Sequence, residues 1–464
     1  MPRVVIKDFG PFEEAHLELK PLTLIIGKNC VGKSMLVYLV WSLAVLTPDF
    51  DKLDEIAMER GAEKLMKDIL NKVRRGKAPE EDFKQLVKIL IESLPIALAS
   101  GFKDTLQRTF SSNIDGLVRE GKERAVIRTE GPKATMEFIL EKNDVKIAKY
   151  EPHLEFIERL KVKVREPNLL RISYRSPHGE VLIEERSINS LGDVAFAISR
   201  VLAHYRDIAF SPFFFVEDIV ALLVDSRAGI SRTLLKPYIS PLVTRGIPYP
   251  DEQFIRLYFK LAEMLERGLI DLEALKPFLK ELGFTLETAY EGGVYTIYIR
   301  TWTGKRLHFS QAPSGIRESL IVALALSTIR TRGYQMPELR APSMVIIEEP
   351  EAHLHPRAQR LLARLIARAV NEQDKIVLLT THSDYLVYAI NNLIALSQRQ
   401  EKIRELGYEQ SEVLKPEHVA AYLAKAEGRK AVLKRLEVSE EGIPEEEFIK
   451  IAEELAHERA RITA

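Results

Sequence analysis

The segment at residues 27–34 constrains this chain more than any other feature of its sequence. It fits the phosphate-binding pattern G-x-x-x-x-G-K-[ST] at every fixed position. The residues are Gly27, Lys28, Asn29, Cys30, Val31, Gly32, Lys33 and Ser34. The glycines allow a tight turn in which backbone N–H groups face phosphate oxygens. Lys33 supplies positive charge to the β- and γ-phosphates, and Ser34 supplies a hydroxyl ligand for Mg²⁺. We therefore expect residues 27–34, termed the phosphate loop below, to bind a nucleotide.

The flanking sequence supports this interpretation. Leu22–Ile26 is a short apolar run that predicts a buried strand leading into the loop. Met35–Leu46 predicts an apolar helix whose N-terminus would face the phosphates. The strand–loop–helix order favours an α/β fold with a mixed sheet flanked by helices.

Composition narrows the class of protein. Lys and Arg number 67 and Asp and Glu number 67, so the formal net charge is zero and no global basic field attracts nucleic acid. A single cysteine excludes an intrachain disulfide and a cysteine-based zinc site, and it suits a reducing cytosol. The apolar stretches 36–46 and 316–329 are too short or too interrupted to span a bilayer. We expect a cytoplasmic protein that is not in a membrane.

The chain changes character along its length. More than the length of a typical domain separates the phosphate loop from the next dense block of chemical motifs, so the nucleotide unit must combine both ends of the chain. The predicted segments are an N-terminal part of the nucleotide-binding unit at 1–50, a helical insertion at 51–122, a β-rich segment at 123–190, a mainly helical insertion ending in a hairpin at 191–304, a C-terminal part of the nucleotide-binding unit at 305–396, and a charged helical extension at 397–464.

An acidic pair follows a second apolar strand. Met344–Ile347 is wholly apolar and ends at Glu348 and Glu349. In phosphate-loop enzymes a strand beside the loop delivers an acid that binds Mg²⁺, and often a second that orients the attacking water. Glu348 and Glu349 fit these roles in that order. The alternative is a solvated loop.

Two further motifs have both a structural and a functional interpretation. His382 comes just after the apolar run Ile376–Leu379, so it either packs structurally or reaches a γ-phosphate. Ser314 precedes an apolar helix ending near Ile329, where we expect it to be the N-cap. With Gly315 it would also form an anion site at a helix N-terminus.

Together these blocks resemble the ABC-type ATPases, most closely the chromosome- and repair-associated branch with SMC proteins, RecF and OLD-type ATPases. The resemblance covers residues 1–45 and 305–395. It rests on Phe9–Phe12 before the phosphate loop, on the run Glu348–Pro356, and on Ser314–Glu318, which is similar to the signature motif of AAA-like ABC ATPases. His382 matches the family's switch histidine.

The resemblance implies ATP and Mg²⁺ as ligands and a homodimer that closes around two ATP molecules. Lys33 and Ser34 of one chain would then face Ser314 and Gly315 of the other, with Glu349 polarising water. Three departures stand out. Glu348 replaces the usual Asp, Ile316 replaces the second glycine of transporters, and no glutamine for Mg²⁺ can be identified. His353 and His355 have the H-x-H spacing of a metal pair as an alternative interpretation.

The favoured function is an ATPase whose dimer cycle acts on nucleic acid or on a partner protein. The alternatives are an ATPase subunit of an antiviral defence complex with a separate nuclease, and the ATP-binding subunit of a transporter. A nuclease domain of this chain's own is unexpected, because the residues after His382 are fewer than a usual domain has. The candidate DNA-binding stretches are the basic runs 72–77 and 119–124.

Overall fold

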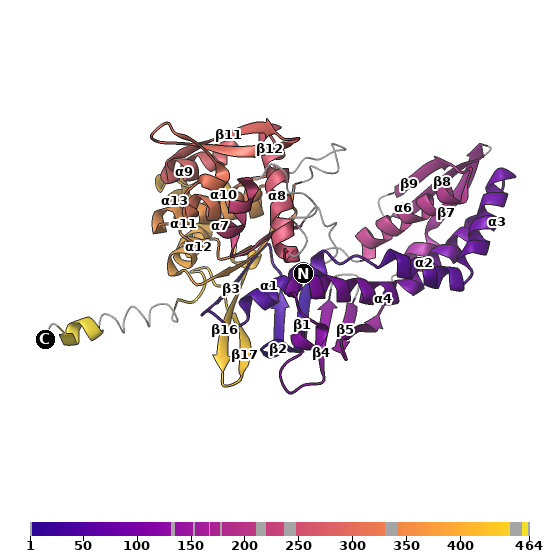
Figure 1. The fold of residues 1–464 in the computed structure, drawn as a ribbon, viewed down its shortest axis with the longest axis horizontal. Helices are drawn as coiled ribbons and strands as arrows, with labels where there is room; N and C mark the ends of the chain where they lie inside the picture. Colours follow the sequence, from indigo (N-terminus) through magenta and orange to yellow (C-terminus); the bar gives the residue numbers. More distant parts are fainter. Residues whose placement is uncertain are drawn as a thin grey trace. The chain divides into compact units, whose positions relative to one another are not determined.

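The computed structural model describes residues 2–130, 135–151, 154–166, 168–176, 179–209, 220–235, 247–329, 341–445 and 457–462. The chain forms two compact units, each built from two segments. Unit 1 comprises Met1–Gly10 and Ser42–Phe215, and unit 2 comprises Pro11–Trp41 and Val216–Ala464. The colours of Figure 1 show that unit 2 combines an early part of the chain with its second half.

Unit 2 is built on a mixed sheet of seven strands. Five of them run parallel in the order β10 (Val220–Leu223), β14 (Met344–Glu348), β15 (Ile376–Thr381), β3 (Leu22–Gly27) and β16 (Val419–Glu427). The last two are β17 (Lys430–Leu436), antiparallel to β16, and β2 (Phe12–Glu18). Every residue of β14 is buried. Continuous apolar strands of this kind are typical of parallel sheets that are covered on both faces.

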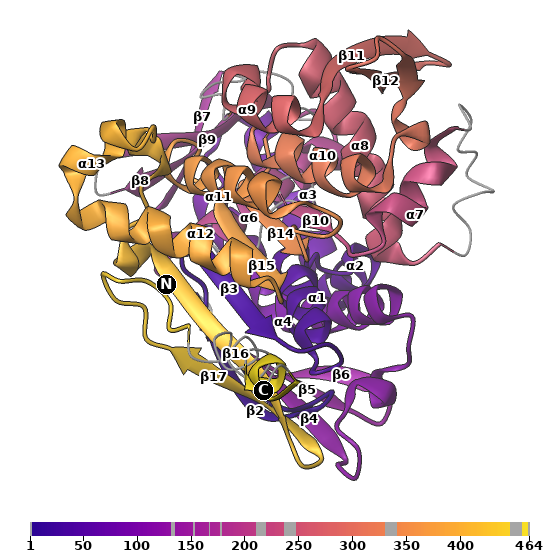
Figure 2. The same ribbon diagram turned by 90° about the vertical axis from the view of Figure 1, so that its left-hand side faces the viewer.

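Helices cover the sheet of unit 2. They are α1 (Lys33–Ala44, whose last residues belong to unit 1), α7 (Arg227–Ser231), α8 (Tyr249–Glu266), α9 (Leu272–Leu282), α10 (Ser314–Leu326), α11 (Pro356–Asn371), α12 (Asp384–Ala395) and α13 (Gln400–Glu405). Helix α10 packs against β10 and β14, while α11 packs against α10, α12 and β15. Figure 2 shows α11 and α12 lying over β14 and β15. A small antiparallel sheet consists of β11 (Phe284–Glu291), β12 (Val294–Thr301) and β13 (Arg306–His308).

Unit 1 has two antiparallel sheets and a group of helices. One sheet has the order β1 (Arg3–Phe9), β4 (Arg124–Glu130), β5 (Thr135–Glu141) and β6 (Asp144–Tyr150). The other consists of β7 (Leu160–Glu166), β8 (Leu169–Ser176) and β9 (Gly179–Ser187). The helices are α2 (Phe50–Glu59), α3 (Ala62–Arg74), α4 (Glu80–Phe110), α5 (Glu155–Glu158) and α6 (Leu191–Ala209).

Helix α4 is long and apolar enough to cross a membrane by length and composition, and it is the one described helix that passes this test. Within the unit, however, it packs against α2, α3 and β6, and 56% of its most apolar window is buried. Buried positions such as Phe83, Val87, Leu90 and Leu94 recur at helical spacing. This pattern is that of a core helix of unit 1.

The structure confirms the predicted α/β class, with a mixed sheet, flanking helices, antiparallel β structure and long helical insertions. Two expectations about the segments were wrong. The second part of unit 2 begins at Val216 rather than at 305, because β10 belongs to the same sheet as β14. Residues 397–464 are not simply helical, since they contain β16 and β17. Burial between β3 and β17 overrides the helix propensity of the alanines in Val419–Glu427. Of the helical extension predicted at 397–464, residues 446–456 and 463–464 lie outside the described residues.

Candidate functional site

The phosphate loop connects β3 to α1 and is packed closely on its inner side. Gly32 has a φ of +89°, and a Cβ at this position would lie 2.7 Å from the ring of Phe12. A Cβ on Gly27 would collide with the carbonyl oxygen of Ala424 in β16. The pattern therefore needs glycine at both positions for steric reasons, as well as for its hydrogen-bonding turn. Cys30 is exposed at the outer side of the loop.

Lys33 points back into the loop. Its Nζ donates hydrogen bonds to the carbonyl oxygens of Gly27 and Lys28, both at 2.8 Å. Burial lowers the pKa of the Lys33 ammonium, and the carboxylates of Glu349 and Glu351 oppose that shift. The backbone carbonyls thus enclose a positive charge within the loop. Phosphate binding requires a positive charge at this position.

Glu348 is the last residue of β14 and is only 2% exposed. Its carboxylate accepts hydrogen bonds from the hydroxyls of Ser34 and Tyr38 and from the backbone N–H of Asp225. Burial raises the pKa of Glu348. Its Oε2 is buried and has no hydrogen-bond partner among the described residues. A buried carboxylate oxygen beside the Ser34 hydroxyl is the donor set that a hard cation such as Mg²⁺ prefers.

Asp225 is a site residue that the sequence did not reveal. It follows β10, which lies directly beside β14 in parallel register, so the carboxyl ends of the two strands meet at one edge. The negative charge of Asp225 contributes to raising the pKa of both Glu348 and Tyr38. The available signal was the same as for Glu348, namely an apolar run followed by an acid. Asp225 therefore provides an acidic group at this edge of the sheet. The sequence offered no glutamine as a ligand for Mg²⁺ here.

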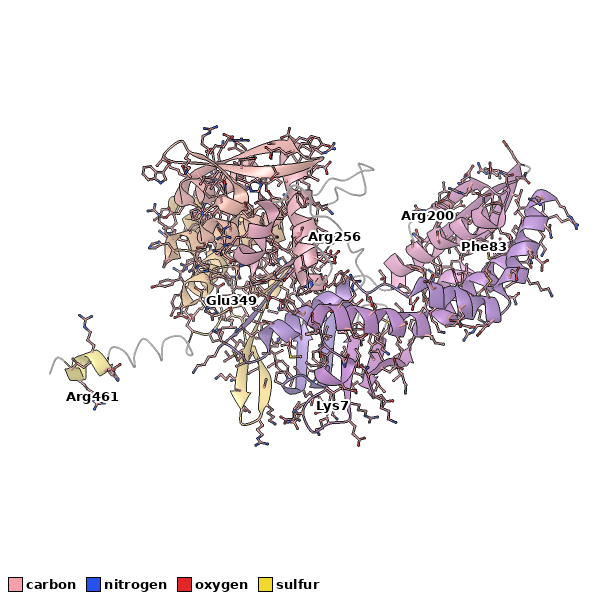
Figure 3. The ribbon with its side chains drawn as sticks, viewed as in Figure 1. Lys7, Phe83, Arg200, Arg256, Glu349 and Arg461 are labelled. Carbon is pink, nitrogen blue, oxygen red and sulfur yellow. The ribbon has the colours of Figure 1, made fainter. Side chains whose placement is uncertain are left out.

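Glu349 and His382 come together at the next point along this edge, and Figure 3 labels Glu349 there. His382 Nδ1 lies 3.2 Å from Glu349 Oε1, and the side chains are 46% and 31% exposed. Glu349 has a φ of 44°, and its N–H donates to the carbonyl oxygen of Thr380 at 3.0 Å. Both side chains are therefore held by adjacent parallel strands while remaining open to a ligand.

A buried carboxylate fixes the backbone of the histidine. Glu351 Oε1 accepts a hydrogen bond from the Thr381 hydroxyl at 2.7 Å and from the His382 N–H at 3.1 Å. Glu351 is 5% exposed, and burial raises its pKa. Glu351 thus positions His382 by accepting the hydrogen bond of its backbone N–H.

Arg227 is the second site residue that the sequence did not reveal. It is the first residue of α7 and is completely buried. Its guanidinium donates to the backbone carbonyls of both Glu348 and Glu349, at 2.6 and 2.9 Å. Its Nε lies 3.2 Å from Glu318 Oε2. An isolated arginine in a segment without a recognised motif gave no signal of this role.

Ser314 is exposed and is the first residue of α10. The expectation that it is the N-cap was wrong by one residue, because Pro313 occupies the cap position with φ −52° and ψ 150°. A Cβ on Gly315 would lie 2.9 Å from the carbonyl oxygen of His353. Ile316, which replaces a glycine of the transporter motif, is buried. Among the described residues, the structure brings Gly315 beside His353 and gives neither Ser314 nor Gly315 a hydrogen bond to the phosphate loop.

The histidines of the H-x-H pair have separate structural roles. The Nδ1 of His355 accepts the Arg357 N–H at the start of α11, at 3.4 Å. His353 has a left-handed backbone with φ 59°. Within the described ranges, no group of three or more His, Cys, Asp or Glu side chains could hold a metal ion. These findings give no support to the metal-pair interpretation.

The basic runs in unit 1 are partly neutralised. Lys72 pairs with Asp82 at 2.5 Å, and Arg119 pairs with Asp8 at 3.2 Å. Lys122 lies 3.9 Å from the same Asp8 carboxylate. These contacts reduce the charge that either run could present to a phosphate backbone.

Residues 233–387 match the family model described as AAA ATPase domain. The matched range includes Ser314, Glu348, Glu349 and His382. It begins after Arg227 and does not include the phosphate loop, which the fold supplies from the other end of the chain. No curated protein matches the chain.

Solved structures of SMC head domains are similar to the chain at low scores. An SMC head bound to the C-terminal winged-helix domain of ScpA has a TM-score of 0.40 and 12% identity, over 94% of this chain and 97% of that chain. The SMC head domain from Thermotoga maritima has a TM-score of 0.36 and 11% identity, over 94% and 98%. An Smc head with an extended coiled coil, bound to the C-terminal domain of ScpA and derived from Pyrococcus furiosus, has a TM-score of 0.39 and 11% identity, over 98% and 100%.

Proposed function

We propose that this chain is an ATPase that hydrolyses ATP to ADP and phosphate at the carboxyl edge of the unit 2 sheet. One observation carries the proposal. The Glu349 carboxylate lies 3.2 Å from His382, at the ends of adjacent strands beside the strand that leads to Lys33. The match of residues 233–387 to an AAA ATPase domain supports the same reaction.

The residues at this edge fit a bound Mg²⁺. Ser34 and Glu348 would hold it, since the Glu348 carboxylate already contacts the Ser34 hydroxyl and keeps one buried oxygen without a partner among the described residues. When bound, Mg²⁺ neutralises charge on the β- and γ-phosphates. Because the chain would supply only two ligands, phosphate and water oxygens would provide the others.

The chain's own groups can perform the remaining steps. Lys33 and the loop N–H groups would bind the phosphates and stabilise the charge that develops on them. Glu349 would accept a hydrogen bond from the attacking water and orient it in line with the γ-phosphorus. His382, held beside Glu349, would contact the γ-phosphate and report its presence.

The proposal includes an ATP-dependent homodimer. Ser314 is exposed at the start of α10 and makes no described hydrogen bond to the phosphate loop of its own chain. A second chain would bring its Ser314 and Gly315 to the γ-phosphate, where a helix N-terminus stabilises negative charge. Opening of this dimer after hydrolysis would provide a two-state switch.

We further propose that the switch acts on nucleic acid or on a partner protein in the cytoplasm. The single cysteine, exposed in the phosphate loop, favours a reducing compartment. Unit 2 contains every residue assigned to the nucleotide site, which leaves unit 1 for the interaction with the target. A DNA shift assay at low and high salt, with and without ATP, distinguishes the two targets.

The central experiment compares steady-state phosphate release by the wild type, Glu349→Gln and Lys33→Ala. We expect Mg²⁺-dependent turnover for the wild type and nearly none for either variant. Equal, near-zero rates for wild type and Glu349→Gln would refute hydrolysis. ATP binding by both proteins in that case would leave a non-hydrolytic role for the nucleotide.

A further inference from the structure

The guanidinium of Arg227 stands between two parts of unit 2 that the proposed function assigns to different ATP molecules. It is completely buried, at the start of α7. One side of it faces the chain as it leaves β14, and the other faces the helix that Ser314 begins. Its contacts with these two parts are direct, so no intervening group is needed.

On the first side, Arg227 holds the backbone that carries the catalytic carboxylates. Nη1 donates to the carbonyl oxygen of Glu348 at 2.6 Å, and Nη2 donates to that of Glu349 at 2.9 Å. Glu349 has a positive φ of 44°, which non-glycine residues adopt only where surrounding contacts impose it. Arg227 is one of the contacts that hold this backbone, together with Thr380, whose carbonyl accepts the Glu349 N–H.

On the other side, Arg227 holds the signature helix α10. Its Nε donates to the Glu318 carbonyl at 2.9 Å and lies 3.2 Å from the Glu318 carboxylate. The other carboxylate oxygen of Glu318 accepts the Ala228 N–H at 2.8 Å. Arg317 adds a hydrogen bond to the Ala228 carbonyl. The first turns of α10 are thus fastened to the same short helix that holds Glu348 and Glu349.

The chemistry of the pair suits a mechanical connection. A guanidinium is planar, and its five donors have fixed directions, so it sets the distance between all the carbonyls that it binds. A buried ion pair is seldom more stabilising than apolar residues of the same volume. The Arg227–Glu318 pair is therefore better explained by the geometry that it imposes than by stability.

We infer that Arg227 and Glu318 are positioning residues that couple the two ATP sites of the dimer. The inference rests on the proposed function, in which Glu349 acts on the ATP of its own chain while Ser314 serves the partner's. When one γ-phosphate is lost, the Glu349 backbone shifts. Arg227 transmits this shift to α10, and the contact between Ser314 and the other ATP changes. Hydrolysis at the two sites is consequently cooperative.

The test uses the full chain and three variants. Glu318→Gln keeps the shape of the side chain and an oxygen for the Ala228 N–H, but it removes the charge facing Arg227. Arg227→Lys keeps a cation but loses the fork that reaches both carbonyls. Glu412→Gln is the matched control, because Glu412 is 3% exposed and pairs with Arg364 in the same unit, at 2.8 Å and outside the site.

Two properties are measured for each protein: the affinity for a non-hydrolysable ATP analogue, and the kinetics of ATP hydrolysis, which give the Hill coefficient and the maximal rate. We expect Glu318→Gln and Arg227→Lys to bind the analogue within about twofold of wild type. Their Hill coefficients should fall to about 1, and their turnover should fall about tenfold. Glu412→Gln should match the wild type in both properties.

Different failures are distinguishable. A wild type that hydrolyses no ATP refutes the proposed function and the coupling together. A wild type with a Hill coefficient of 1, or a cooperative Glu318→Gln variant, refutes the coupling alone. Equal losses of cooperativity and turnover in Glu318→Gln and Glu412→Gln also refute the coupling. Such losses would show that removing any buried charge has the same effect. If Glu318→Gln does not fold, Arg227→Lys provides the same comparison.

Discussion

The phosphate loop and the signature segment at 314–318 both lie at the start of a helix in unit 2, yet their surroundings are opposite. In the loop, Lys33 is buried and bonded to two backbone carbonyls, and Gly32 packs on Phe12. In the signature segment, Ser314 is exposed and is the first residue of α10, directly after the cap residue Pro313. The first helix N-terminus is thus packed against other parts of the chain, whereas the second faces solvent. In the dimer proposed above, one chain would therefore supply only one side of each nucleotide site.

The largest expected effect comes from the carboxylate on the completed side. Glu349→Gln should lower turnover about a thousandfold, because the amide cannot accept the proton of the attacking water. ATP binding should persist, and an ATP-bound dimer should accumulate in size-exclusion chromatography. Glu401→Gln, at an exposed glutamate of α13, should leave turnover unchanged. A Glu349→Gln rate within tenfold of wild type would remove this carboxylate from the chemistry.

Lys33→Ala should weaken ATP binding about 100-fold, since it removes charge-assisted hydrogen bonds to the phosphates. The dissociation constant is measured by isothermal titration. Lys28→Ala is the control within the same loop, because the Lys28 side chain is exposed and only its carbonyl contacts Lys33. An equal loss of ATP affinity in both variants would show that the overall positive charge of the loop binds the nucleotide, and not the enclosed Lys33 ammonium in particular.

The signature segment should behave differently from the loop. Ser314→Arg should leave ATP affinity of the single chain unchanged, prevent the ATP-induced dimer and lower turnover about tenfold. Gln400→Arg, at the exposed first residue of α13, is a matched change at another helix start. Sedimentation of both variants in the Glu349→Gln background gives the dimer fraction. If Ser314→Arg forms a normal dimer, the second chain does not bind at the signature segment. The contrast between this segment and the phosphate loop would then have no bearing on the dimer.

The smallest effect is on stability. Gly32→Ala should lower the free energy of unfolding by about 1–3 kcal/mol, because the new Cβ meets both a positive φ and the Phe12 ring. Gly304→Ala has a similar φ of +80° but open space around it, so its cost should be about 1 kcal/mol. Urea denaturation measures both. Equal losses would mean that the ring contact contributes nothing to the shape of the loop.

Most residues of the candidate site could be predicted because each follows a short-range rule. A glycine-rich loop after a strand, an acid after an apolar run and a histidine after another run are all visible in a few residues. The structure places Glu349 and His382 side by side because β14 and β15 are neighbours in a parallel sheet. Ser314 was misassigned as the N-cap because Pro313 competes for the same position.

Arg227 could not be predicted, since nothing local distinguishes it from any other arginine, and Asp225 was missed although it follows an apolar run as Glu348 does. Their roles depend on β10 pairing with β14, more than a hundred residues away along the chain. The strands β16 and β17 were missed for a related reason. The alanine-rich sequence of β16 favours a helix in isolation, and burial beside β3 makes it a strand, to which β17 pairs in antiparallel register.

The sequence by itself indicated a nucleotide site, because the phosphate-binding pattern consists of residue types at fixed local spacing. It also determined the α/β class, through the apolar runs that precede each motif. The tertiary structure alone decided which distant segments share the sheet, and thereby brought Arg227 and Asp225 to the ends of β14. It also decided that the phosphate loop is enclosed while Ser314 is exposed. Burial and long-range strand pairing are cooperative properties of the whole unit, and no local pattern encodes them.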